Sequence, residues 1–133
     1  MQTKNKVLFD SSALFALIRM ESGYEQLEGL LASSCISAVN LSEIVTRLAE
    51  LGIADTEIKE IVDEVIPEIL PFTHKAGFLS GILMIKAKEL GIDLSLGDIA
   101  CIATGIINNM VVYTTNPVWQ ELQLDDLSIV VIS

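Results

Sequence analysis

Short aliphatic segments alternate along the chain with longer segments of helical spacing, and this alternation limits the fold more than any other feature. The strand-like segments are 7–9, 35–39, 68–72, 110–115 and 127–132. Apolar residues three and four apart indicate helices at 11–18, 22–33, 40–52, 55–66, 75–91 and 96–109. Strands that alternate with helices form a mostly parallel sheet covered on both faces. The sequence therefore predicts an α/β fold, a three-layer α/β/α sandwich with a mostly parallel five-stranded sheet.

The length and the composition fit a single domain over residues 1–133. A chain of 133 residues can bury a core without disulfides. Apolar residues make up 51% and aromatic residues only 5%, which indicates an aliphatic interior of the kind found in sheets covered by helices. The apolar excess also indicates that a partner or a second copy covers part of the surface.

The charge limits the partners of the chain. A net charge of −10 with eight scattered basic residues argues against a broad phosphate-binding surface. A nucleic-acid substrate would be contacted locally with the help of bound cations, whereas a strongly basic protein is a natural partner.

The cysteines and the start of the chain indicate a compartment. We expect Cys35 and Cys101 to be buried free thiols in a reducing compartment. "MQTKNK" leads directly into a strand, and no apolar run approaches the ~20 residues of a membrane span. We therefore expect a cytoplasmic protein with no membrane partner.

Polar residues follow the predicted strands at four connections. Asp10 leaves the first strand, Glu43 stands near the start of the helix after the second, Asp98 opens the most apolar helix, and Asn116 follows the fourth strand. In a parallel sheet, ligands bind at the carboxyl ends of the strands. These side chains are therefore the candidate catalytic residues.

Helix capping is the alternative explanation for each acid. Asp10 precedes two serines, and the pairs Asn40 with Glu43 and Ser95 with Asp98 have the spacing of a capping box. Three carboxylates in one crevice would repel one another unless a cation neutralises them. We therefore expect Asp10, Glu43 and Asp98 to hold Mg²⁺ or Mn²⁺, since oxygen ligands suit these ions.

A cation held by carboxylates suits phosphodiester chemistry, because it activates a water and stabilises charge on the phosphate. Ser12 and Thr114 lie close to the acids in sequence and are candidates to orient that water or an acid, although turn or cap hydroxyls are common. Arg47 follows Glu43 by four residues, so it either pairs with that acid or contacts a substrate phosphate.

Four segments in order resemble the PIN-domain ribonucleases, specifically the VapC-like toxins of prokaryotic toxin–antitoxin pairs. The segments are "VLFDSSALFALI", "ISAVNLSEIV", "LSLGDIACIATG" and "VVYTTNPVW". The resemblance implies a PIN-like fold, a Mg²⁺- or Mn²⁺-dependent endoribonuclease that cleaves RNA, a homodimer, and inhibition by a small basic antitoxin. It also implies that Asp10, Glu43 and Asp98 are the acids of the family.

One position departs from the family pattern. The family usually has an acid where this chain has Asn116. An amide oxygen can still bind a metal, but it adds no charge. A weakly active or inactive PIN-like binding module is therefore the alternative function. A phospho-receiver is a third possibility, but the chain lacks the acceptor Asp and the later Lys that it would need.

Overall fold

A computed structural model of the chain describes residues 6–66 and 68–132. The strands are β1 (Val7–Phe9), β2 (Ser34–Ser37), β3 (Ile69–Leu70), β4 (Val111–Thr114) and β5 (Ile129–Val131). The helices are α1 (Ser11–Ile18), α2 (Glu25–Glu28), α3 (Ala38–Glu50), α4 (Asp55–Val65), α5 (His74–Glu89) and α6 (Leu96–Asn108). Two 3₁₀ helices are η1 (Leu31–Ser33) and η2 (Pro117–Leu122). Within these ranges, no helix is long and apolar enough to cross a lipid bilayer.

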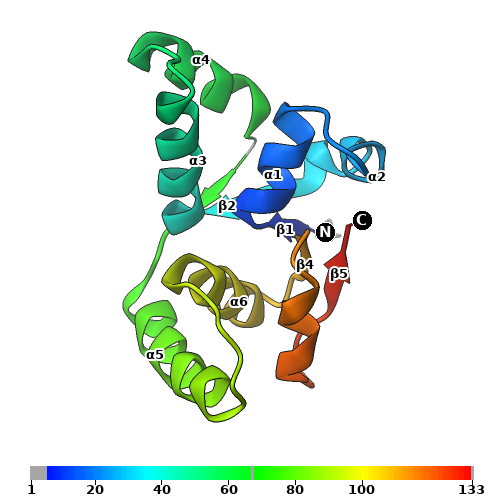
Figure 1. Ribbon diagram of the computed structural model, residues 1–133, viewed down its shortest axis with the longest axis vertical. Helices are drawn as coiled ribbons and strands as arrows, with labels where there is room; N and C mark the ends of the chain where they lie inside the picture. The colour runs from blue at the N-terminus through cyan, green and yellow to red at the C-terminus, as the bar shows by residue number, and fades with distance from the viewer. Residues whose placement is uncertain (1–5, 67, 133) are drawn as a thin grey trace, which may run out of the picture.

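The five strands form one sheet in the order β3-β2-β1-β4-β5. Every pair of neighbouring strands is parallel. In Figure 1, α1 to α4 lie on one side of the sheet, and α5 and α6 lie on the other. The predicted α/β/α sandwich is confirmed, and the sheet is fully parallel among the described residues. All strands therefore deliver their carboxyl ends to one edge.

Alternate strand residues face two separate cores, as the pleat requires. Leu8 is in register with Cys35 and Val112, and all three belong to the core under α5, α6 and η2. Their neighbours Phe9 and Ile36 belong to the core under α1, α3 and α4. Burial on both faces explains why the central strand β1 is apolar throughout rather than alternating with polar residues.

Most predicted boundaries shift by one to three residues, and two of the differences have a physical cause. The helix predicted over 22–33 is only the single turn α2 followed by η1, and no side chain caps α2. At the second strand, the Ser37 hydroxyl accepts a hydrogen bond from the Asn40 N–H at 3.1 Å, so α3 begins at Ala38. The capping box predicted with Asn40 as its first residue is therefore wrong, because Ser37 is the cap.

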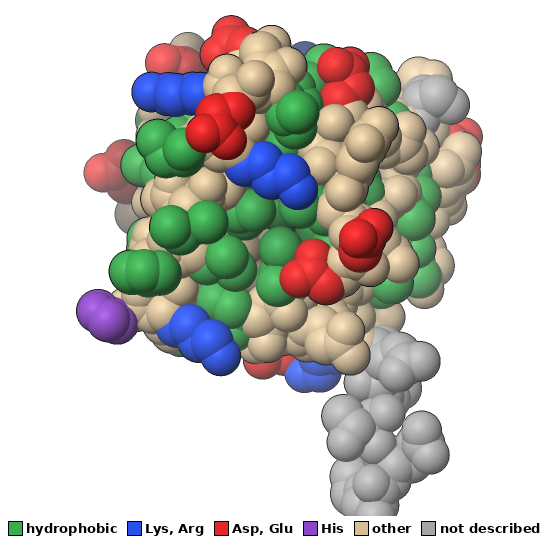
Figure 2. All heavy atoms as spheres, turned by 90° about the horizontal axis from the view of Figure 1, so that it is seen from below, with side chains coloured by type: hydrophobic (Ala, Val, Ile, Leu, Met, Phe, Trp, Pro, Cys, Tyr) green, Lys and Arg blue, Asp and Glu red, His purple; other side chains and the backbone are tan. Residues whose placement is uncertain are grey.

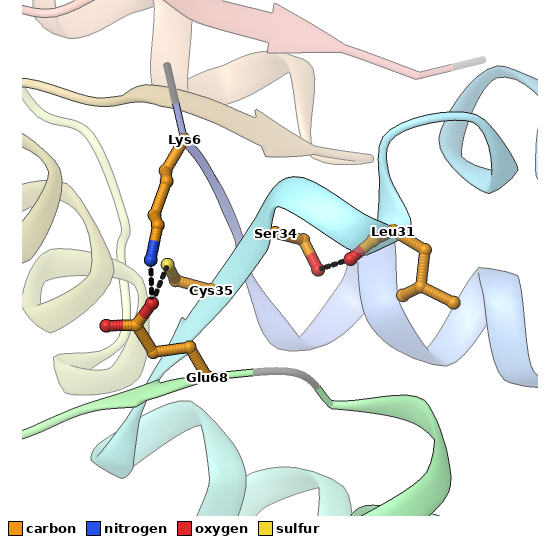
Figure 3. A network of polar contacts seen from close by, with 5 residues as sticks. All are labelled: Lys6, Leu31, Ser34, Cys35 and Glu68. Carbon is orange, nitrogen blue, oxygen red and sulfur yellow. Dashed lines mark hydrogen bonds and ion pairs between the residues drawn. The ribbon is translucent and has the colours of Figure 1, made fainter. Parts of the chain in front are cut away.

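A polar contact joins the amino ends of three strands (Figure 3). Lys6, next to β1, forms an ion pair with Glu68, next to β3. Between them, the Cys35 thiol of β2 donates to the same Glu68 carboxylate with a sulfur–oxygen distance of 3.7 Å. Burial, and then the Glu68 charge, raise the pKa of the Cys35 thiol to about 11, so it remains a donor. Cys35 and Cys101 are both buried and free, as predicted.

Helix α6 lies unusually close to the sheet at Gly105. A Cβ atom on this residue would lie 2.5 Å from Cγ2 of Val112 and 3.1 Å from Cδ1 of Leu127. Distances this short require the strand or the helix to move. The absence of a side chain at Gly105 thus sets the spacing between α6 and β4.

We predict that Gly105→Ala destabilises the fold by about 1–3 kcal/mol, because overpacking outweighs the ~1 kcal/mol that alanine gains in a helix. Chemical unfolding measures the change. Gly29→Ala is the matched control, because Gly29 also has helical backbone angles but open space around its Cα. Equal or greater stability of Gly105→Ala would show that the packing at this point is loose.

Candidate functional site

Asp10 lies where β1 ends and α1 begins. Its backbone is extended, with φ −80° and ψ 176°, and its Oδ1 accepts the Ala13 N–H at 2.7 Å as the cap of α1. Its own N–H donates to the Tyr113 carbonyl of β4 at 3.0 Å. The side chain is only 3% exposed. The capping role considered for Asp10 is therefore real, and it fixes a buried carboxylate at the carboxyl edge of the sheet.

Two hydroxyls hold the same carboxylate. Ser12 Oγ donates toward both Asp10 oxygens at 2.7 and 2.9 Å, and Thr114 Oγ1 donates to Oδ2 at 2.6 Å. The Thr115 N–H in turn donates to Ser12 Oγ at 3.0 Å. Ser12 and Thr114, singled out in the sequence for orienting water or an acid, thus both contact Asp10. They join α1 and β4 through it.

Burial raises the pKa of Asp10 to about 6, even though its hydrogen bonds favour the ionised form. The nearby Asp98 charge makes a smaller contribution to this value in the same direction. Neither ion pair among residues 6–66 and 68–132 includes Asp10. The carboxylate is thus costly to ionise where it lies.

Glu43 lies in the second turn of α3, and its carboxylate reaches the first turn of α6. Asn40 Nδ2 donates to Glu43 Oε1 at 2.7 Å. A Cβ on Gly97 would lie 2.6 Å from the Glu43 Cδ, so the carboxylate rests directly on the Gly97 backbone. Glu43 is therefore brought beside the residue that precedes Asp98.

Asp98 is the third residue of α6 and closes a capping box. Its Oδ2 accepts the Ser95 N–H at 3.0 Å, and Ser95 Oγ accepts the Asp98 N–H at 3.1 Å. The capping box predicted for this pair is confirmed. Asp98 is half-buried, and its charge is close enough to act on Asp10.

Cys101 is fully buried in α6, one turn after Asp98. Burial raises the pKa of its thiol, and the charges of Asp10, Asp98 and Glu43 raise it further. In the part of the chain that the structure describes, however, no three Asp, Glu, His or Cys side chains form a group that could hold a metal ion. Each acid is turned toward its own protein partners, and the metal centre stays a prediction.

Asn116 and Arg47 have partners of their own. Asn116 Oδ1 accepts the Val118 N–H at 3.1 Å as the cap of η2, and its N–H donates to Thr114 Oγ1 at 3.1 Å. The exposed Arg47 guanidinium lies 3.8 Å from the centroid of the Phe15 ring, a cation–π contact. The ion pairs found within the described ranges do not include one between Arg47 and Glu43.

A surface hollow of about 490 Å³ opens beside Glu43. Its lining is Ser11, Val39, Ser42, Glu43, Thr46 and Arg47. The hollow joins the start of α1 to one face of α3. It places an arginine and several hydroxyl groups next to one of the candidate acids.

Sequence patterns missed Asn40, Gly97 and Cys101 as parts of the site. The sequence predicts Asn40 as a helix cap and Cys101 only as a buried thiol. A glycine before an acid at a helix start carries no signal of close contact with another helix. These roles depend on how α3 meets α6, which only the fold shows.

No protein-family model matches the chain, and no curated protein sequence matches it. Solved structures match its fold over nearly its whole length. A VapBC complex from Rickettsia felis bound to promoter DNA is 18% identical, with a TM-score of 0.75, over 96% of this chain and 98% of that one. DNA-bound VapBC from Salmonella typhimurium is 18% identical, with a TM-score of 0.74 and the same coverage. A member of the VapBC toxin–antitoxin family from Mycobacterium tuberculosis is 22% identical, with a TM-score of 0.66, over 97% and 100%.

These likenesses show the fold of the chain. It is the fold of the VapC PIN-domain toxins, as the sequence motifs indicated. The acids Asp10, Glu43 and Asp98 lie on three different elements of that fold, all toward the carboxyl edge of the sheet.

We predict that Asp10→Asn raises the free energy of unfolding at pH 7 by ~1–3 kcal/mol in a chelating buffer, since a pKa raised from 3.8 to about 6 opposes folding of the ionised form. Stability of the unmodified chain should fall as the pH rises between these values, and the advantage of the variant should vanish below pH 3.8. Urea unfolding across this range measures both. A constant difference at all pH values would contradict the shift.

Proposed function

We propose that this chain is a metal-dependent endoribonuclease and the toxin of a type II toxin–antitoxin pair. The observation that supports this most is that Asp10, Glu43 and Asp98 all lie near helix starts at the carboxyl edge of a parallel sheet, where Asp98 acts on the buried Asp10 and Glu43 contacts Gly97 next to Asp98. Asp10 is nearly fully buried there, and its pKa is raised by burial and by Asp98. A divalent cation would neutralise this charge.

The donor set suits a hard cation, because it consists of carboxylate oxygens. Asp10, Glu43 and Asp98 would hold Mg²⁺ or Mn²⁺, which when bound activates water and stabilises negative charge on phosphate. Ser12 and Thr114 keep the Asp10 carboxylate in one orientation. Glu43 and Asp98 would complete the ligand set while each keeps one carboxylate oxygen on its present donor, the Asn40 amide and the Ser95 N–H.

RNA would be contacted locally, because the chain has few cations. Arg47 lines the hollow beside Glu43, and its stack on Phe15 holds the guanidinium at that rim. A planar guanidinium can bind a phosphate through two hydrogen bonds. We therefore assign Arg47 to the positioning of an RNA phosphate next to the acids.

The partner that restrains the toxin would be a small basic antitoxin. The structural neighbours from Rickettsia felis and Salmonella typhimurium are VapBC complexes. This chain carries a net charge of −10, which complements a basic partner. An arginine of the antitoxin would pair with the carboxylates in place of the cation.

A second copy of the chain would cover α5. Phe78, Ile82 and Ile85 are 71%, 57% and 56% exposed and lie on one face of that helix. Figure 2 shows the molecule from below, where hydrophobic side chains gather within a border of charged ones. A row of large apolar side chains in water is typical of an interface. We therefore propose that the homodimer forms through α5.

A second candidate function is a PIN-like module that binds RNA or a protein without cleavage. Asn116 favours it, because its amide oxygen already caps η2 and the residue supplies no negative charge. Metal-dependent cleavage separates the two functions.

We predict that the purified chain cleaves RNA only with Mg²⁺ or Mn²⁺, and that Asp10→Asn abolishes this cleavage with the fold intact. Loss of a charge that binds the metal directly should cost more than the ~10–100-fold typical of groups behind the ligands. Cleavage of a mixed RNA pool, with circular dichroism of each sample, measures the effect.

Asp125→Asn is the matched control, because Asp125 is exposed and lines a different hollow, beside the start of β4. This variant should cleave like the unmodified chain. Unchanged cleavage by Asp10→Asn would refute the assigned site. Absence of cleavage by the unmodified chain with either metal would favour the binding module.

We also predict that Ile82→Glu converts a dimer into a monomer, because a buried charge at an apolar interface is costly. Light scattering at micromolar concentration measures the mass. Leu51→Glu is the control, since Leu51 is 53% exposed at the end of α3. A monomeric unmodified chain, or a dimeric Ile82→Glu variant, would rule out this interface.

A further inference from the structure

Asn40 is a buried amide whose hydrogen bonds link three parts of the fold. It is 1% exposed, and its Oδ1 accepts the Ser37 hydroxyl at 2.7 Å. Its Nδ2 donates to Glu43 Oε1 at 2.7 Å and to the Gly97 carbonyl of α6 at 3.3 Å. One amide group therefore binds the candidate acid and the helix that the acid contacts.

Gly97 supplies the surface on which the Glu43 carboxylate rests. A Cβ at this position would lie 2.6 Å from Cδ and 2.8 Å from Oε1 of Glu43. Carbon atoms do not approach this closely, so any side chain at position 97 would displace the carboxylate. The Glu43 carboxylate is thus held by a donor on one side and by bare backbone on the other.

We propose that Asn40 and Gly97 form a clamp that positions the Glu43 carboxylate across the contact between α3 and α6. The lower end of α3 lies beside α6 in Figure 1, and the two helices are in contact there. The clamp fixes the side chain beside Asp98 before a cation or substrate binds, so its role in the reaction rests on the proposed function. Asn40 and Gly97 are positioning residues and contact no reacting atom.

Fixing Glu43 in advance lowers the cost of binding. A glutamate side chain in water has many rotamers, and holding it in one of them carries an entropy cost. Because the clamp restricts the Glu43 side chain when the protein folds, this entropy loss does not reduce the free energy of binding an ion or substrate. Asp10 is held in the same way by Ser12 and Thr114, but within a different pair of elements.

A thermal-unfolding cycle in a chelating buffer tests the clamp without any nuclease activity. Gly97→Ala should lower the Tm by on the order of 5 °C, because its new methyl group meets the Glu43 carboxylate. In a Glu43→Ala background, the same change should not lower the Tm, because the obstructing atoms are gone. Gly29→Ala, which has no atom within 4 Å of its Cβ position, should behave alike in both backgrounds.

Calorimetric titration with Mn²⁺ tests the positioning role. Asn40→Ala and Gly97→Ala should each weaken Mn²⁺ binding by about 10–100-fold, as expected for groups that orient a ligand. Asn108→Ala is the control for the amide, because Asn108 Nδ2 donates to the Thr104 carbonyl within α6. If a residue had only a structural role, its substitution by alanine would lower the Tm and leave the Mn²⁺ affinity of the folded protein unchanged.

The thermal-unfolding cycle and the Mn²⁺ titration together show whether the clamp or the proposed function has failed. A Gly97→Ala penalty of equal size in both backgrounds would overturn the clamp, whatever the nuclease activity. Folded Asn40→Ala and Gly97→Ala variants with unchanged Mn²⁺ affinity would also overturn it. A third outcome is that the unmodified chain binds no Mn²⁺ and cleaves no RNA, while Gly97→Ala still lowers the Tm only when Glu43 is present. The proposed function would then fail, and the contact between Glu43 and Gly97 would stand.

Discussion

The burial of the Asp10 carboxylate is the constraint on which the site depends. A charge removed from water is stable only if donors replace its hydration. Here those donors come from α1, through Ser12 and the Ala13 N–H, and from β4, through Thr114. The pKa of Asp10 nevertheless stays well above its usual range. The fold thus holds the carboxylate in place without neutralising it, and the remaining charge is available to a ligand.

The fully parallel sheet and the close approach of α6 bring Asp98 close enough to act on this charge. Parallel strands send their carboxyl ends to a single edge, where α1 and α3 begin. The absence of a side chain at Gly105 lets α6 lie close to β4. Asp98 is in the first turn of α6, and its charge acts on Asp10 from there. The packing of an apolar helix against the sheet therefore decides the electrostatics of a polar site some two turns away.

The sequence predicted the layers of the fold, because they follow from local periodicity and parallel topology. The gathering of the three acids around one cation stays a prediction. The predicted start of α3 was wrong. Both Ser37 and Asn40 can cap a helix, and only the register of β2 selects Ser37. The stack of Arg47 on Phe15 was also missed, because it depends on how α1 and α3 pack. Contacts between elements far apart in the chain leave no periodic signal, and the contact between Glu43 and Gly97 is of this kind.

Capping and metal binding are compatible roles for these acids. A carboxylate has two oxygens and about four lone pairs, so a cap bond occupies only part of its capacity. Asp98 caps α6 through Oδ2, and Glu43 accepts from Asn40 through Oε1. Among the described residues, none donates a hydrogen bond to Asp98 Oδ1 or Glu43 Oε2. For Asp98, the cap bond fixes the rotamer and leaves Oδ1 available, so a helix start that needs an acid for its own stability also offers an oriented ligand. Glu43 caps none of the described helices, and its Oε2 packs against the Gly97 backbone.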